Sequence, residues 1–223
     1  MHTITQSGFH TLEGQKEISI ADNLCVFLLD DGSTDRTIHI GTGAQVSLYG
    51  LYNNEMKRNI TCLQESQHSS LEIRYILISR DEQKIDAKIF SDIRASHTKS
   101  DVKILSLASE KGYIILDGSI QIGKGIEKVD AHLLEENIFL GSSGKISGIP
   151  TLLVGSDDVS AGHACRMERI SDEKLFYLRS RGIEKDHAVK AMIGGYLNDM
   201  LVGLKQQEKT VAENIINKVF QLV

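Results

Sequence analysis

Residues 16 to 154 consist of short segments with the two-residue alternation of β-strands, separated by clusters of turn-forming residues. Typical segments are RTIHIG, LEIRYILIS and DVKILSLAS, and typical turn clusters are DDGSTD, GTG and GKG. β-Branched residues are enriched in the segments, whereas small and polar residues fill the turns. No window before residue 172 has the apolar period of an α-helix. The pattern therefore predicts a mainly β domain, which is a sandwich, a barrel or a β-helix.

Two observations favour a parallel β-helix over a sandwich. The segments resemble one another loosely, and His39, His68 and His97 fall at equal intervals of 29 residues, as expected for successive coils. The turns also lack the Asn-Gly and Asp-Gly signals of hairpins, apart from Asp31-Gly32 and Asp117-Gly118. On the pattern alone, the β-helix is only slightly favoured.

The chain changes from strand patterns to helical patterns near residue 171. Ser171 and Asp172 predict an N-cap for a short helix that stops at Gly182. From Glu184 to Leu204, apolar residues recur with the spacing of a long helix that has one buried face. We therefore divide the chain into a β-helix core, residues 1–170, and a C-terminal helical region, residues 171–223.

Two details of the helical region are also predicted. Interior glycines such as Gly194, Gly195 and Gly203 each cost a helix ~1 kcal/mol relative to Ala, so we expect the long helix to have close neighbours. A final helix is expected after Gln207, with Thr210 and Glu213 at the spacing of a capping box.

Composition limits the partners and the compartment. The net charge of -5 and the pI near 5.9 disfavour a general nucleic-acid or anionic-membrane surface. No secretory signal is expected at the N-terminus, and no apolar run approaches the ~18 residues that span a membrane. The three cysteines, Cys25, Cys62 and Cys165, are odd in number and widely spaced, which suits a reducing compartment. We expect a cytoplasmic protein with no nucleic-acid or membrane partner.

Two motifs resemble a known family. The run LFYLRSRGI, Leu175 to Ile183, follows DDV-x-x-x-H, Asp157 to His163, and together they resemble the C-terminal signature of the SufB/SufD family of iron-sulfur cluster assembly scaffolds. Upstream, residues 112–154 are similar to the β-helix coils of that family, including its Asp-Ala pair at Asp130-Ala131 and the Asn137 to Leu140 strand. The likeness extends from about residue 95 to 204. The chain would be a short, minimal member that lacks the N-terminal helical region.

The resemblance implies a fold, partners and a role. The expected fold is a right-handed parallel β-helix (solenoid) followed by C-terminal α-helices. The expected role is a non-catalytic scaffold subunit of the SUF machinery, which dimerises through the β-helix with itself or with a SufB/SufD-like partner. Its C-terminal helices would bind a SufC-like ABC ATPase. The chain has no phosphate-binding GxxxxGK[ST] loop of its own, so ATP hydrolysis would come from that partner.

The resemblance also implies site residues. His163 stands at the family's histidine, and if residues 159–165 form a strand, Cys165 lies on the same face. Imidazole and thiolate both suit iron, although a structural His and a small buried Cys are the alternatives. The family's usual ligands are depleted, because Ala161 replaces a cysteine of the SufD type. We expect no permanently bound cofactor, and at most a transient Fe-S cluster or iron shared across a dimer.

The remaining candidates are the docking residues and two further metal ligands. The residues implied in docking the ATPase are Leu175, Phe176, Tyr177, Arg179, Arg181, Gly182, Met192 and Tyr196. Cys62 and His132 are further possible ligands that more readily have structural roles.

Two other functions stay open. A carbohydrate-active β-helix enzyme would need paired carboxylates, and Asp157-Asp158 are a poor pair because adjacent strand residues point to opposite faces. A degenerate paralogue would only stabilise a partner and bind no metal.

Overall fold

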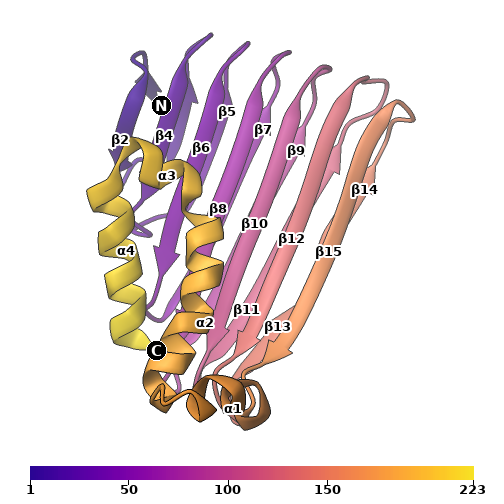
Figure 1. Ribbon diagram of the computed structural model, residues 1–223. Coiled ribbons are helices and arrows are strands. Elements are labelled where there is room, and N and C mark those ends of the chain that lie inside the picture. The colour runs from indigo at the N-terminus through magenta and orange to yellow at the C-terminus, as the bar shows by residue number, and fades with distance from the viewer.

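The computed structural model describes all 223 residues as a parallel β-solenoid with a layer of helices on one side (Figure 1). Consecutive strands alternate between two sheets as far as β13, and each strand pairs in parallel with its neighbours in its own sheet. Two strands and their turns thus make one coil. The sequence-based prediction of a mainly β, parallel β-helix followed by C-terminal helices is confirmed.

In sheet B the strands lengthen from 5 residues in β2 to 11 in β15, whereas sheet A ends in two strands of 4 residues each. Sheet A contains β1 His2–Ile4, β3 Glu17–Ile20, β5 Arg36–Ile40, β7 Met56–Gln64, β9 Lys84–Ile93, β11 Tyr113–Ile122, β13 Lys145–Gly148 and β14 Thr151–Val154. Sheet B contains β2 Gly8–Leu12, β4 Cys25–Asp30, β6 Gln45–Tyr52, β8 Ser70–Ser79, β10 Lys99–Ala108, β12 Val129–Phe139 and β15 Val159–Arg169.

Of the two 29-residue intervals between histidines, only the one from His68 to His97 corresponds to one coil of the solenoid. In sheet B, Lys99 of β10 pairs with Ser70 of β8, which is an offset of 29 residues. His68 and His97 precede these strands at equivalent turn positions, and their rings stack with centroids 5.0 Å apart. His39 instead lies within β5 of sheet A, so its spacing is a coincidence.

The solenoid interior is one hydrophobic core. Alternate residues of both sheets point inward and form a cluster of 33 buried residues that runs from Ile4 to Leu133. Ile, Leu and Val dominate it, as parallel sheets require. Within this core, Asp30 accepts hydrogen bonds from the hydroxyls of Tyr52 and Tyr75 and from Arg36.

Sheet B is also covered on its outer face, by the helical layer (Figure 1). A second cluster of 17 buried residues joins that face to the helices, for example Ile76 and Leu105 to Leu197 and Leu204. This explains the continuous apolar ends of β8 and β10, which are buried on both faces. No helix in the structure is long and apolar enough to cross a membrane.

The first helix follows the prediction closely. Helix α1 covers Asp172–Ser180, and the Ser171 side chain accepts a hydrogen bond from the Lys174 amide. Gly182 stands just beyond the helix with a φ of 84°, a left-handed conformation that favours glycine.

The later helices differ from the prediction in two ways. The expected long helix is divided at Leu201 into α2, Lys185–Met200, and α3, Val202–Gln207. Helix α4, Lys209–Leu222, starts with no side-chain cap, so the predicted capping box is wrong: Thr210 is already inside the helix.

The glycines of the helical region have different surroundings. A Cβ at Gly203 would lie 2.8 Å from the Tyr49 hydroxyl, as expected for a closely packed helix, and one at Gly194 would lie 3.5 Å from Phe220. A Cβ at Gly195 would meet nothing within 4 Å. The expected close neighbour is therefore absent at Gly195.

The sequence pattern did not predict three of the strands, and at one Asp-Gly dipeptide it indicated a hairpin turn that does not exist. Strands β1, β2 and β13 are short and poorly buried, so their alternation is weak. Asp117-Gly118 resembles a hairpin turn but lies in the middle of β11. Gly118 faces the interior there, next to the Glu135 side chain.

Candidate functional site

Strand β15 closes sheet B at the C-terminal end of the solenoid and pairs only with β12. His163 lies beside Leu133, and Cys165 lies beside Glu135. Since Leu133 belongs to the interior core, both residues share the inward face, as the sequence predicted. No further coil covers this face, and both His163 and Cys165 are exposed.

Cys165 contacts the preceding coil through Asn137. The Asn137 side-chain amide donates a hydrogen bond to Cys165 Sγ at 3.4 Å, while Asn137 Oδ1 is buried without a partner. Partial burial raises the pKa of the Cys165 thiol, and the hydrogen bond from Asn137 opposes that effect. Cys165 is therefore a partly shielded thiol, not the fully buried residue of the alternative.

Glu135 is the most unusual group near this end of the solenoid. Its side chain points inward, its solvent exposure is 0%, and neither carboxylate oxygen has a hydrogen-bond partner. Burial raises the pKa of Glu135 to about 7, although the nearby Gly118 backbone amide and Asn137 side chain act to lower it without meeting the geometry of a hydrogen bond. Sequence reasoning missed Glu135, although the alternation Ala131, Leu133, Glu135 places a carboxylate at a core position of a predicted strand.

The structure does not preassemble a metal site from the predicted ligands. No three His, Cys, Asp or Glu side chains converge on a common point anywhere in the protein. The His163 side chain makes no hydrogen bond, whereas the Cys165 side chain is joined to Asn137. At this end one chain thus offers fewer than three such ligands at any one point, which is less than a complete coordination shell.

The other ligand candidates lie elsewhere. Cys62 is fully buried in the core, where burial raises the pKa of its thiol to about 12, so it is a structural residue. His132 is exposed and lies 3.0 Å from Asp130. Cys62 lies in an earlier coil, whereas His132 lies beside Gly162 of β15 but points to the opposite face of sheet B from His163 and Cys165.

The predicted docking residues separate into two groups. On α1, Phe176 and Tyr177 are 71% and 63% exposed, and the Arg181 guanidinium lies 5.3 Å from the Tyr177 ring centre. Leu175 instead belongs to the outer core, at 2% exposure. A shallow depression follows α1, lined by Phe176, Arg179, Ser180, Gly182, Ile183 and Glu184.

Met192 and Tyr196 of α2 face β15 and are half-buried. The Tyr196 hydroxyl lies 3.4 Å from Glu168, and the Arg166 guanidinium is 5.8 Å from its ring centre. Glu168 of β15 also pairs with Lys174 of α1 at 2.7 Å. The strand that carries Cys165 is therefore joined by polar contacts to both α1 and α2.

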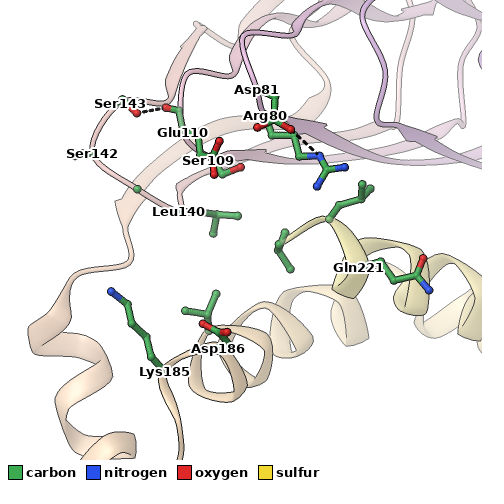
Figure 2. A pocket seen from close by; sticks show the side chains of 14 residues that line it. Arg80, Asp81, Ser109, Glu110, Leu140, Ser142, Ser143, Lys185, Asp186 and Gln221 are labelled. Carbon is green, nitrogen blue, oxygen red and sulfur yellow. Dashed lines mark hydrogen bonds and ion pairs between the residues drawn. The ribbon is translucent and has the colours of Figure 1, made fainter.

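Another cleft at the seam between solenoid and helices lies away from β15. Its volume is about 520 Å³. Figure 2 shows that it lies between turns of the solenoid and the start of α2. Arg80 and Lys185 alternate there with Asp81, Glu110 and Asp186. Charges of both signs alternate there, and the lining includes serines and carboxylates but neither His nor Cys, so it holds no Ser-His or Cys-His pair.

The comparisons with known proteins identify the family. Residues 33–196 match the family model described as "SUF system FeS cluster assembly, SufBD core domain", and this match covers most of the chain. The chain belongs to the SufB/SufD family.

Three curated SufB/SufD relatives give the extent of the similarity. The iron-sulfur cluster assembly protein SufD of Escherichia coli K12 is 26% identical over 157 residues, which are 68% of this chain and 37% of the relative. A SufBD family protein of Archaeoglobus fulgidus is 28% identical over 131 residues, 59% of this chain and 35% of the relative. SufD of Bacillus subtilis is 35% identical over 104 residues, 44% of this chain and 24% of the relative. The aligned part is thus about a third of each relative or less.

The SufB/SufD match includes β15, α1 and part of α2, and ends at Tyr196. The resemblance of Asp157 to His163 and of LFYLRSRGI is therefore confirmed as family membership. The ligand role of His163 and Cys165 and the docking role of α1 remain predictions.

Proposed function

We propose that this chain is a non-catalytic scaffold subunit of the SUF iron-sulfur cluster assembly machinery in the cytoplasm. The observation that carries the proposal is the placement of β15. It exposes His163 and Cys165 at the open end of the solenoid and is joined through Glu168 to α1, which exposes Phe176 and Tyr177. Family membership favours this role over a carbohydrate-active enzyme.

The proposed partner of α1 is a SufC-like ABC ATPase. Exposed aromatic and arginine side chains are typical anchors of protein interfaces, and Phe176, Tyr177 and Arg181 supply them on one short helix. Met192 and Tyr196 of α2 would help to position this surface, because they pack against β15, whose Glu168 also contacts α1.

A pull-down with the cognate ATPase tests the docking proposal. Phe176→Asp in the full chain should abolish retention of the ATPase, whereas Val202→Asp should not. Val202 is a suitable control, since it is 55% exposed but lies on α3. Circular dichroism should show that both variants fold. Equal retention by wild type and Phe176→Asp would exclude α1 as the docking element.

The proposed dimer interface is the open end itself. Edge strand β15 has unpaired backbone groups, and Ile149, Leu153, Val154 and Met167 are between 49% and 82% exposed nearby. The occupant would be a second copy or a SufB/SufD-like subunit. Leu153→Lys should reduce association in light-scattering chromatography, alone or with the longer subunit; unchanged association in both mixtures would exclude this edge.

Iron and sulfide are the proposed cargo, held transiently and shared across that dimer. One chain brings no three ligands together, so a complete cluster would need donors from both subunits. Anaerobic reconstitution with iron and sulfide, followed by visible absorbance, tests His163. His163→Ala should lose most of the absorbance. Identical bands in wild type and variant would mean that His163 is not a ligand, whereas a wild type that gains no absorbance would support the degenerate, metal-free paralogue.

A further inference from the structure

A buried carboxylate without partners needs a physical explanation. Buried polar groups are normally hydrogen-bonded, and a carboxylate that is neither paired nor bonded lowers the stability of the fold. Glu135 is in this position, since its exposure is 0% and both carboxylate oxygens lack partners.

The opposite wall of the solenoid leaves room for this side chain. A Cβ at Gly118 would lie 2.4 Å from Glu135 Oε1, and a Cβ at Gly148 would lie 3.3 Å from Glu135 Oε2. Both glycines belong to sheet A, on β11 and β13. Because both positions facing the carboxylate are glycines, the interior has room for the Glu135 side chain, which a larger residue at either position would reduce.

Two further donors lie on the same inward face. Cys165 is the register neighbour of Glu135 on β15, and its side chain opens to solvent at the end of the solenoid. Asn137, two residues after Glu135, is fully buried and keeps Oδ1 unpartnered while its amide group contacts Cys165 Sγ. A thiol, a carboxylate and an amide oxygen therefore lie near one another, and of these the thiol is exposed at the open end.

We propose that Glu135 and Cys165 form a binding site for a borderline divalent metal ion such as Fe²⁺. The thiol releases one proton to solvent and forms a metal-sulfur bond, the carboxylate supplies an oxygen, and Asn137 Oδ1 is available as a neutral donor. Thiolate with carboxylate favours Fe²⁺, Co²⁺ or Zn²⁺ over Mg²⁺ and Ca²⁺. This inference rests on the proposed function, because it gives the iron an entry point inside the subunit.

The site differs from the pair predicted from the sequence. His163 is not required, and the second ligand comes from the preceding coil. Water, or a donor from a partner subunit, completes the coordination, in agreement with the absence of a three-ligand group within the chain.

Anaerobic titration of the full chain with Co²⁺ tests the site, because a thiolate ligand gives cobalt a charge-transfer absorption. Wild type should show this band. Cys165→Ser should remove it, and Glu135→Gln should weaken apparent affinity by about tenfold or more.

Two matched controls make the test specific. Glu136→Gln changes the adjacent carboxylate, which points to the outer face and pairs with Arg166 at 3.6 Å. Cys25→Ser changes another exposed cysteine, at the start of β4. Both controls should bind Co²⁺ as wild type does. A band that persists in Cys165→Ser, or affinity of Glu135→Gln within about twofold of wild type, would overturn the proposal.

The ATPase pull-down separates this inference from the proposed function. Glu135→Gln and Cys165→Ser leave α1 untouched and should retain the ATPase. If wild type retains the ATPase but gives no thiolate band, the metal site is refuted and the scaffold role stands. If the band is present but no ATPase is retained, docking fails while the metal site stands.

Discussion

Lys174 of α1 lies 2.7 Å from Glu168 of β15, so the first turn of the helical layer is tied directly to the last strand of the solenoid. Arg166 and Tyr196 contact the same carboxylate at 3.0 and 3.4 Å. These contacts, led by Lys174, lower the pKa of Glu168. The carboxylate therefore holds three elements together, β15, α1 and α2.

Replacing Glu168 should loosen α1 without unfolding the solenoid. Glu168→Gln removes the charge that pairs with Lys174 and Arg166, which we expect to cost about 1 kcal/mol because the partners are partly solvated. Hydrogen exchange of the α1 amides should accelerate several-fold, while exchange in β8 and β10 stays slow. Glu173→Gln, an exposed change on the same helix, is the control. Unchanged exchange in α1 would show that Glu168 does not anchor the helix.

Glu135 should make stability fall as pH rises. Its pKa is raised from 4.5 to about 7 on folding, so the folded state holds this proton more tightly than the unfolded chain. The free energy of unfolding should therefore fall between about pH 4.5 and 7, by about 2 to 3 kcal/mol from this group. Urea unfolding at pH 5 and pH 8 with a chelator present measures the loss, which Glu135→Gln should remove.

The control for this pH effect is Glu127→Gln, because Glu127 is exposed in a turn. It should keep the wild-type difference between pH 5 and pH 8. If Glu135→Gln loses as much stability as wild type over this range, another group causes the effect.

Asp30 is the anchor of the N-terminal half of the core. It accepts hydrogen bonds from Arg36 Nε at 2.6 Å, Tyr52 at 2.5 Å and Tyr75 at 2.8 Å. Asp30→Asn leaves the buried Arg36 without its main counter-charge, so we expect a loss of about 3 to 5 kcal/mol in the free energy of unfolding. Thermal unfolding, with the exposed Glu13→Gln as control, measures it. A change below about 1 kcal/mol would contradict the anchoring role.

Two glycine substitutions should have opposite signs. A Cβ at Gly50 would lie 2.2 Å from a ring carbon of the buried Tyr75, which Asp30 holds in place. Gly50→Ala should therefore destabilise by about 2 kcal/mol or more. Gly195→Ala, on the exposed side of α2 with no neighbour, should stabilise by about 1 kcal/mol. Denaturant unfolding of both variants measures the two changes in the free energy of unfolding. Changes of the same sign would show that Gly50 and Gly195 do not differ in their packing as proposed.

The sequence predicted those parts of the fold that depend on local alternation. Segments such as LEIRYILIS identify strands because neighbouring residues face different environments, and the Ser171 cap and Gly182 mark α1 by local backbone chemistry. Residues 1–15 and β13 have little buried surface, so the same signal is weak there.

The contacts between coils could not be predicted from one sequence, because they depend on how the strands are aligned. The bond between Asp30 and Tyr75 joins residues 45 positions apart, and its existence depends on the register of three coils. The same holds for Glu135 and Cys165, which become neighbours only because β15 pairs with β12 at an offset of 30 residues. The family resemblance indicated His163, but it gave no information on Glu135, whose importance depends on Gly118 and Gly148 across the interior.

The coil offsets in sheet B increase from 18 residues between β2 and β4 to 29 between β8 and β10 and 31 between β10 and β12, so the solenoid tapers. The narrow end presents an edge strand of 5 residues, β2, and the wide end presents one of 11, β15. An incoming strand would find about twice as many free backbone groups at the wide end. The lengthening of the coils therefore makes strand addition more favourable at the wide end than at the narrow end. This preference depends on turn and strand lengths and not on any single interface side chain.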